Sequence, residues 1–410
     1  MPSNKQKHLI FAVLFSIIII DALGIGIIFP LLGPLFLSKT SQIVSSSLSH
    51  NMRNIIYSLA LAAYCTLMFL GAPFWGDMSD RIGRKKVLLF CIFGTSLSLA
   101  LSAFGIFISS VTTLILGRAA AGFFAGSLAV AQAAIVDISR RHDKIRNLSY
   151  ISFAGCFGFS FGPTLGGLLA FPNLQNGIGL ALPFLGAALI AGLNGVGLAA
   201  LFCETFHLEN KAKVKLSQGW NIFVSAFRNH KIRNLSFIFL LAEAGWSICF
   251  QFIPVYVFDL HHYTSLHIGY LMTFAGLIFS ISLLAIMPIL SKRISIRHIK
   301  DYSLILTALG ILLALFKSQI MLWISIIPIG LGGALFYVAL LAMFSDAVNK
   351  NMQGWVMGVF AAVEAAAWSL GGLLVGILHL LGDAAPFIIG AAFVLASFCL
   401  GMRKIYIKSQ

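Results

Sequence analysis

Between two long apolar runs, residues 76–86 read Gly76-Asp77-Met78-Ser79-Asp80-Arg81-Ile82-Gly83-Arg84-Lys85-Lys86. A charged connector this short predicts two neighbouring antiparallel helices, and its two glycines permit a close backbone approach or a positive φ. Four cations within six positions favour the cytoplasmic side of a membrane. This segment therefore sets the orientation that we expect for the rest of the chain.

The composition is that of a polytopic membrane protein. Of the 410 residues, 59% are hydrophobic and only 10% are charged, whereas soluble domains carry about 25% charged residues. Long apolar runs recur along the chain, and each can form a helix across a hydrocarbon core ~30 Å thick. We therefore expect an all-α polytopic membrane protein with almost no chain left for a soluble domain.

The net charge of +15 is unevenly distributed along the chain. If the chain crosses the membrane twelve times, all 28 cations fall in cytoplasmic segments except Lys39, Arg53 and Lys317 outside and Arg118 within a span. This distribution follows the positive-inside rule and predicts that both termini are cytoplasmic. It also argues against nucleic acid as a partner, because the cations are shared among separate loops.

We predict twelve transmembrane helices near residues 9–37, 54–76, 86–108, 111–137, 147–171, 180–203, 233–259, 266–291, 299–317, 320–346, 353–379 and 383–403. The predicted domains are an N-terminal six-helix bundle at 1–203, a polar cytoplasmic linker at 204–232 and a C-terminal six-helix bundle at 233–410. Within the linker, the amphipathic residues 220–227 fit either a helix on the membrane surface or a plain tether. The sequence Leu165–Leu169 recurs as Leu370–Leu374, which favours two pseudo-symmetric halves.

The spacing Gly-x-x-x-Asp-Arg-x-Gly-Arg-Lys in residues 76–85 resembles the signature loop between helices 2 and 3 of the major facilitator superfamily of secondary transporters. Three further stretches resemble its drug/proton antiporter branch, in particular the tetracycline/proton antiporters: residues 21–34, residues 117–122 followed by Gly126, and residues 158–167. The resemblance implies two bundles that alternate access to a central site and export small amphipathic compounds in exchange for protons. Tetracycline-type members carry an acid in the third span, and Cys91–Ser96 has none, which argues against tetracycline itself.

Two charged residues lie deep within predicted spans. At ~1.5 Å per residue, Arg118 lies roughly 10 Å from the outer end of its helix, and Asp21 lies about 18 Å from the cytoplasmic end of its own, a similar depth. An unpaired arginine there costs roughly a few kcal/mol. We hypothesise an Asp21–Arg118 pair whose competition with a proton or a substrate couples the two; a purely structural pair is the alternative.

Glu243 and Glu364 are the other deeply placed acids. Each lies about 15–17 Å from the cytoplasmic end of its helix, close to the middle of a core ~30 Å thick. A carboxyl group surrounded by apolar side chains can exchange protons near neutral pH, as a proton carrier must. We therefore predict that both take part in proton coupling or substrate binding, with local helix–helix hydrogen bonding as the alternative.

By resemblance, the cytoplasmic segment acts as a gate. The hinge acid Asp80 is expected near the N-terminus of span 11, where the helix dipole favours an anion, and Arg84 is expected to bridge to Asp137 at the end of span 4. Such a charge lock would hold the outward-facing state. The complete predicted gate consists of Gly76, Asp80, Arg81, Gly83, Arg84, Lys85 and Asp137.

The segment 158–167 matches the pattern that marks antiporters of this superfamily. Gly158, Gly162 and Gly166 lie four residues apart and form one stripe on which a second helix can approach closely, while Pro163 removes a backbone donor and favours a bend. With Gly167, these residues predict a rocking interface, and static helix packing is the alternative. The polar and aromatic residues expected near the substrate cavity are Asn194, Trp246, Gln251, Phe336, Tyr337 and Trp368.

Nothing in the sequence resembles a Walker P-loop, a nucleophile elbow, a zinc motif or a haem ligand pair, and the six cysteines lack metal-like spacing. We therefore expect no enzyme activity, no cofactor and no metal, and an ion gradient as the energy source. The expected partners are a small-molecule substrate, protons and the lipid bilayer, and we expect a monomer in a bacterial inner membrane. The alternatives are a proton-coupled importer of a metabolite or an anionic chelate such as a siderophore, and a non-transporting sensor.

Overall fold

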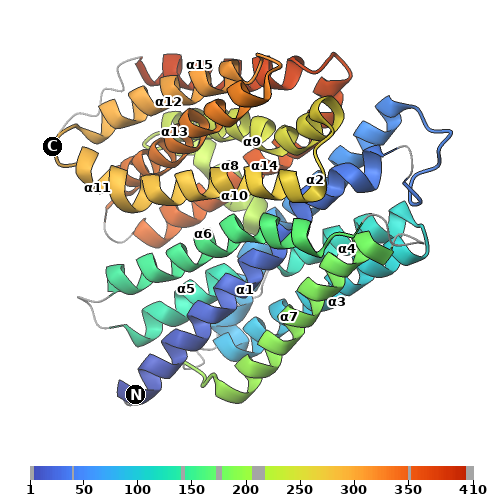
Figure 1. The fold of residues 1–410 in the computed structure, drawn as a ribbon. Helices are drawn as coiled ribbons and strands as arrows, with labels where there is room; N and C mark the ends of the chain where they lie inside the picture. The colour runs from blue at the N-terminus through green and yellow to red at the C-terminus, as the bar shows by residue number, and fades with distance from the viewer. Residues whose placement is uncertain are drawn as a thin grey trace. The chain divides into compact units, whose positions relative to one another are not determined.

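The computed structural model describes residues 4–38, 41–139, 144–171, 178–205, 218–349 and 352–402, which form helices joined by turns and loops (Figure 1). The helices are α1 Asn4–Leu37, α2 His50–Ile82, α3 Arg84–Phe107, α4 Val111–Phe124, α5 Ser127–Ile138, α6 Lys144–Leu169, α7 Ile178–Leu201, α8 Gln218–Arg228, α9 Arg233–His261, α10 Ser265–Ile281, the π-helical turn η2 Ser282–Ile286, α11 Met287–Leu290, α12 Ile296–Leu313, α13 Gln319–Asp346, α14 Gln353–His379 and α15 Ala385–Met402. The all-α prediction is confirmed.

Ten helical segments of the described chain are long and apolar enough to cross a membrane, and Phe153–Leu169 is a shorter apolar helix. The ninth predicted span, α12, is less apolar because Arg297, Lys300 and Asp301 lie in its first two turns. Counting α4 with α5, and α10 with α11, gives the twelve predicted spans.

The chain divides into two compact units. Unit 1 contains residues 1–219 together with 262–276, and unit 2 contains residues 220–261 together with 277–410. Residues 206–217 of the predicted linker lie outside the described residues. The division into two six-helix domains at 204–232 therefore stays a prediction.

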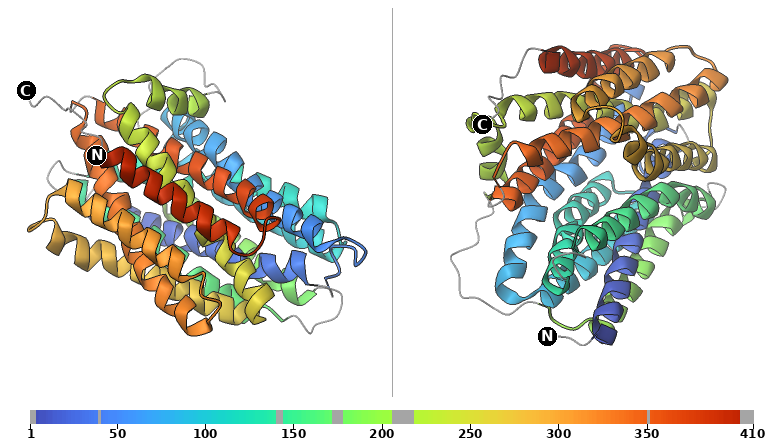
Figure 2. Two further views of the ribbon diagram at one scale, coloured as in Figure 1. Left: turned by 90° about the horizontal axis from the view of Figure 1, so that it is seen from above. Right: turned by 90° about the vertical axis from the view of Figure 1, so that its left-hand side faces the viewer.

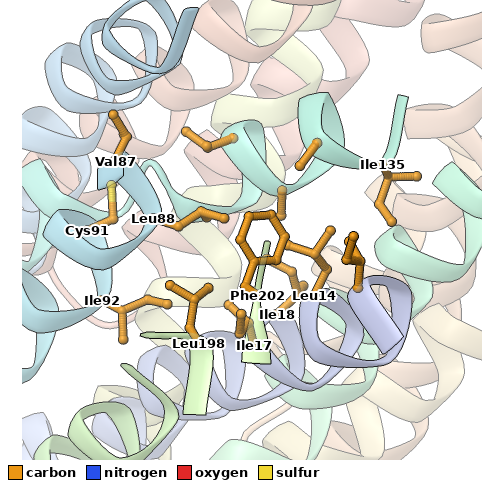
Figure 3. Packing of buried hydrophobic residues seen from close by; sticks show 14 of the residues in the cluster. Leu14, Ile17, Ile18, Val87, Leu88, Cys91, Ile92, Ile135, Leu198 and Phe202 are labelled. Atoms are coloured by element: carbon orange, nitrogen blue, oxygen red, sulfur yellow. The ribbon is translucent and has the colours of Figure 1, made fainter. Parts of the chain in front are cut away.

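The core of unit 1 forms where α1, α3, α5 and α7 meet. Figure 3 shows Phe202, which directly follows α7, pointing into a cluster that includes Leu14 and Ile18 of α1 and Leu88 of α3. Phe202 is only 1% exposed. Its burial fixes the end of α7 beside the start of α3, a position that matters for the gate.

In unit 2, α9 is the central helix, and most of its apolar window is buried. Gly245 of α9 lies close enough to Gly390 of α15 that a methyl group on Gly390 would reach the Gly245 carbonyl oxygen at 2.9 Å. The Ser397 hydroxyl of α15 donates to the Ile238 carbonyl oxygen of α9 at 2.7 Å. α9 is thus held on one side by α15, and its other side is free to carry polar side chains toward α13 and α14.

Span 4 is broken, which the sequence did not predict. The indole Nε1 of Trp75 donates to the Phe123 carbonyl oxygen at 2.9 Å. In a continuous α-helix that oxygen would accept from the backbone N–H of Ser127. The Trp75 hydrogen bond therefore lies at the break, where α4 ends at Phe124 and α5 starts again at Ser127.

Span 8 is also irregular, since a π-helical turn at Ser282–Ile286 separates α10 from α11. Pro288 follows directly in α11. Its ring lacks an N–H and would clash with the carbonyl group four residues earlier in a regular helix, so the backbone widens there.

Candidate functional site

Asp21, Tyr64 and Arg118 line one pocket within unit 1, together with Thr95 and apolar residues of α1, α3 and α4. The cavity volume is about 10 Å³, roughly the space that one water molecule requires. Tyr64 Oη, Thr95 Oγ1 and the Nε and Nη1 atoms of Arg118 are buried without a hydrogen-bond partner among the described residues. Buried polar atoms of this kind are normally satisfied by water or a ligand, so we infer that the pocket is hydrated.

The structure places Asp21 and Arg118 on the same pocket without a direct ion pair between them among the described residues. Asp21 Oδ2 instead accepts a short hydrogen bond from the Ser127 hydroxyl at the start of α5. The Arg118 guanidinium lies over the Tyr64 ring, with Cζ 4.7 Å from the ring centroid, in a cation–π contact. The predicted ion pair is thus replaced by the Asp21–Ser127 and Arg118–Tyr64 contacts. The role of Asp21 and Arg118 in proton coupling stays a hypothesis.

Glu364 lies one helical turn before Trp368 on α14, and Trp368 contacts Glu243 of α9, so both acids lie where these two helices of unit 2 meet. Each carboxyl group accepts one hydrogen bond from an aromatic side chain. Trp368 Nε1 donates to Glu243 Oε1 at 3.0 Å, and Tyr337 Oη donates to Glu364 Oε2 at 3.1 Å. Glu243 is only 4% exposed, whereas Glu364 is half-buried. The two acids of the C-terminal half therefore form one site.

Further aromatic rings pack against Trp368 next to this acid pair. The ring of Trp246 stacks on Phe250 at 4.8 Å between centroids, and each of these two rings meets Trp368 edge-on at 5.7 Å. Trp246 Nε1 donates to the Ile329 carbonyl oxygen at 3.2 Å, which fixes the orientation of its indole. The arrangement combines two carboxyl groups with aromatic faces, and both features attract a cation.

The other predicted cavity residues divide between the two units. Gln251 Nε2 donates to the Ser247 hydroxyl at 2.6 Å and to the Trp368 carbonyl oxygen at 3.1 Å, so Gln251 belongs to the acid–aromatic site. Phe336 is 1% exposed, which fits packing. Asn194 lies in unit 1, where its Nδ2 donates to the Ile17 carbonyl oxygen at 3.5 Å.

The connector at 76–86 is shorter than the sequence predicted, because α2 continues to Ile82 and α3 begins at Arg84. Only Gly83 interrupts the helices, with φ +98°, a conformation that a side chain rarely adopts. A methyl group at Gly76 would meet no atom within 4 Å, so packing does not require glycine there. Arg81 pairs at 3.6 Å with Asp77 on the same helix.

Arg84 is the centre of the cytoplasmic charge cluster. Its guanidinium contacts Asp80 at 2.6 Å, Asp137 at 3.0 Å and the Ser79 hydroxyl at 2.5 Å. The structure thus brings together the predicted Asp80, Arg84 and Asp137, and connects the ends of α2, α3 and α5. Arg84 is 5% exposed, so all three contacts are shielded from solvent on the arginine side.

Glu204 belongs to the same cluster, and the sequence analysis missed it. Its Oε1 accepts from the backbone N–H of Arg84 at 2.9 Å, and its Oε2 accepts from that of Lys85 at 3.1 Å. These are the first N–H groups of α3, which have no acceptor within the helix and which favour an anion. Lys85 Nζ donates to the Ala199 carbonyl oxygen of α7 at 2.8 Å. Glu204 therefore ties the end of α7 to the start of α3.

Glu204→Ala is expected to lower the thermal unfolding midpoint, because two α3 N–H groups lose their charged acceptor; the expected cost is about 1 kcal/mol for a cap at the protein surface. Glu204→Gln retains a neutral acceptor, so its thermal unfolding midpoint is expected to lie between those of Glu204→Ala and the wild type. Thermal unfolding in detergent measures both. The control is Cys203→Ala at the exposed neighbouring position. Equal midpoints for Glu204→Ala and wild type would contradict the capping role.

The glycine stripe of α6 packs against α1, as Figure 1 shows for these two neighbouring helices. A methyl group at Gly158, Gly162 or Gly166 would collide with backbone atoms of α1 between Ile19 and Ile27. Pro163 stays within the continuous helix α6, and Gly167 instead faces the start of α10 at Ser265 and Leu266. The stripe thus brings two backbones together, while its role in rocking stays a prediction.

The family model described as Major Facilitator Superfamily matches residues 14–300. The tetracycline resistance protein of class C from Escherichia coli is 28% identical over 96% of both chains, and multidrug resistance protein 2 of Bacillus subtilis (strain 168) is 25% identical over 96% of this chain and 94% of the relative. Among solved structures, the human organic anion transporter MFSD10 has a TM-score of 0.70 at 21% identity, covering 98% of this chain and 100% of that chain. A D-xylose–proton symporter has a TM-score of 0.72 at 13% identity and covers 97% of both chains.

Proposed function

Because the chain belongs to the Major Facilitator Superfamily, we propose that it is a proton-coupled antiporter that exports small amphipathic compounds, above all cations, by alternating access. Curated relatives that match nearly the whole chain carry names of tetracycline or multidrug resistance proteins, which supports drug efflux. As members of this superfamily are transporters, no enzyme activity is proposed.

The Glu243–Glu364 pair is the observation that carries this proposal. Two neighbouring carboxylates repel each other when both are ionised, so the pair favours holding a proton unless a cation takes its place. The faces of Trp246, Phe250 and Trp368 favour an organic cation in the same position. A proton and a cationic drug would therefore compete for one carboxyl pair, which is the requirement for obligatory exchange.

In unit 1, the hydrated pocket with Asp21, Tyr64 and Arg118 is the second proposed element of coupling. Water in this pocket would carry protons to or from Asp21, while the Nε and Nη1 atoms of Arg118 remain available as donors for an anionic partner. The cluster around Arg84 is proposed as the gate that holds one conformation of the cycle. Breaking its contact with Asp137 would change the balance of conformations without touching the acid pair.

We further propose a bacterial inner membrane location, cytoplasmic termini and a functional monomer. The cations of the linker and of the loops around α2–α3 and α11–α12 support this orientation. The proposed partners are the substrate, protons and the bilayer, without nucleic acid.

The experiment uses purified protein in liposomes with an acidic interior and an enclosed pH dye. A panel of lipophilic cations, tetracycline and anionic metabolites is added outside. Antiport predicts proton release from the interior when a cation enters. Acidification of the interior with an anionic metabolite would instead establish an importer, which the unpaired Arg118 donors favour as a second candidate. No proton movement with any compound would favour a sensor.

A further inference from the structure

A row of aromatic side chains, exposed at both ends and half-buried in the middle, connects the short helix α8 with the membrane span α9. Trp220, Phe223 and Phe227 follow one another on one face of α8, with ring centroids 5.7 and 5.0 Å apart. Phe227 then meets Phe237 of α9 at 4.8 Å. Trp220 is 56% exposed and Phe237 is 44% exposed, so the row is open at both ends.

The geometry sets the level of this row relative to the bilayer. α9 is one of the membrane-spanning helices, and Phe237 lies in its second turn. An exposed apolar side chain near the end of a span faces lipid, and Trp is enriched at this boundary because its ring is amphipathic. The Ser236 hydroxyl donates to the Ala226 carbonyl oxygen at 3.1 Å, which fixes α8 to α9. In the left view of Figure 2, the yellow-green α8 lies crosswise to α9.

The turn between the two helices is strongly basic. Arg228, Lys231 and Arg233 are exposed, as is His230. None of the four forms an ion pair within the described chain. The sequence from residue 210 to residue 242 contains six Lys or Arg residues and no Asp or Glu. The cations of this turn are therefore not neutralised by acidic residues of the same segment.

We propose that α8 and the turn Asn229–Ile232 form a binding surface for anionic phospholipid. The aromatic row enters the boundary between acyl chains and headgroups, and Arg228, Lys231 and Arg233 contact the lipid phosphates. Charge complementarity and continuity with the lipid-facing side of α9 carry this assignment. It does not depend on the drug or the proton, so it goes beyond the proposed function.

The first measurement uses full-length protein in phosphatidylcholine vesicles that contain a small fraction of a brominated lipid. In one series this lipid is phosphatidylglycerol with brominated acyl chains, and in the other it is phosphatidylcholine with brominated acyl chains. Bromine quenches nearby indoles, and the difference between wild type and Trp220→Phe isolates the signal of Trp220. We expect brominated phosphatidylglycerol to quench Trp220 at a lower mole fraction than brominated phosphatidylcholine, by at least about fivefold, the factor that one cation contributes near an anionic surface.

The second measurement removes the cations. The triple variant Arg228→Gln, Lys231→Gln, Arg233→Gln is expected to abolish the preference for phosphatidylglycerol and to retain quenching by both lipids. The control triple variant is Lys292→Gln, Arg293→Gln, Arg297→Gln, which removes three exposed cations of unit 2 elsewhere and is expected to retain the preference.

Three results would overturn the proposal, and the first two need no cation variant. If neither lipid quenches Trp220, α8 lies in water. Its aromatic row would then be a docking site for a soluble protein. Equal quenching by both lipids in wild type would exclude headgroup recognition. An equal loss of the preference in both triple variants would show that the preference depends on the overall charge of the protein and not on the cations beside α8.

Discussion

Glu364→Gln is expected to reduce cation-driven proton release from acid-loaded liposomes to the level of protein-free liposomes. The amide keeps the size of the side chain and can still accept from Tyr337, whose hydroxyl contacts Glu364 at 3.1 Å, but it cannot release or accept a proton near neutral pH. Glu243→Gln is expected to impair exchange as well, since it leaves a single acid in the site. The enclosed pH dye measures both variants.

The matched control is Asp346→Asn, which makes the same chemical change at an exposed acid of unit 2. It should retain exchange. Binding of a fluorescent lipophilic cation, followed without a pH gradient, separates coupling from binding. If Glu364→Gln still released protons at the wild-type rate, the acid pair would not be the coupling site. Failure of exchange in Asp346→Asn as well would point to damage of the fold.

Gly166→Ala is expected to destabilise the protein by about 1–3 kcal/mol, the usual cost of forcing a methyl group into a packed interface. The added carbon would collide with the carbonyl oxygen of Ile27 on α1, and backbone cannot move aside as a flexible side chain can. Thermal unfolding in detergent measures the change.

Gly155→Ala provides the control on the same helix, because its methyl group would meet only Ile18 Cγ2 at an ordinary 3.6 Å. It should unfold at or slightly above the wild-type temperature, because alanine favours a helix more than glycine does. If the α1–α6 contact also has to slide during transport, Gly166→Ala will lose more transport than its remaining folded fraction explains. An unchanged unfolding midpoint for Gly166→Ala would show that the two backbones are not held as closely as described.

Much of the fold follows from patterns that extend over many residues. Hydrophobic runs predict the spans, and the family resemblance of residues 76–85 implies the contact of Arg84 with Asp137. The ion pair of Arg84 with Asp80 was not predicted, because Asp80 was expected at the N-terminus of span 11. The acids Glu243 and Glu364 could be singled out because ionisable groups are rare within apolar runs. Their depth along two helices placed each of them near the middle of the membrane, but it did not predict that they share one site.

The contacts that were missed depend on single side chains from distant parts of the sequence. Ser127 replaces Arg118 as the direct partner of Asp21, and an interior serine gives no signal in an apolar run. Glu204 looked like one more charge of a polar linker, although its position just after buried Phe202 places it at the start of α3. Tyr64 is similarly ordinary in sequence, and only the three-dimensional position of Arg118 makes it informative.

The break in span 4 has a consequence for the electrostatics around Asp21. At the break, where Trp75 donates to the Phe123 carbonyl oxygen, a new helix N-terminus arises at Ser127, whose hydroxyl contacts the Asp21 carboxyl group. The partial positive charge of a helix N-terminus favours an anion. The break thus places a fixed dipole without net charge beside Asp21, while Arg118, held over the Tyr64 ring, keeps Nε and Nη1 without a hydrogen-bond partner among the described residues.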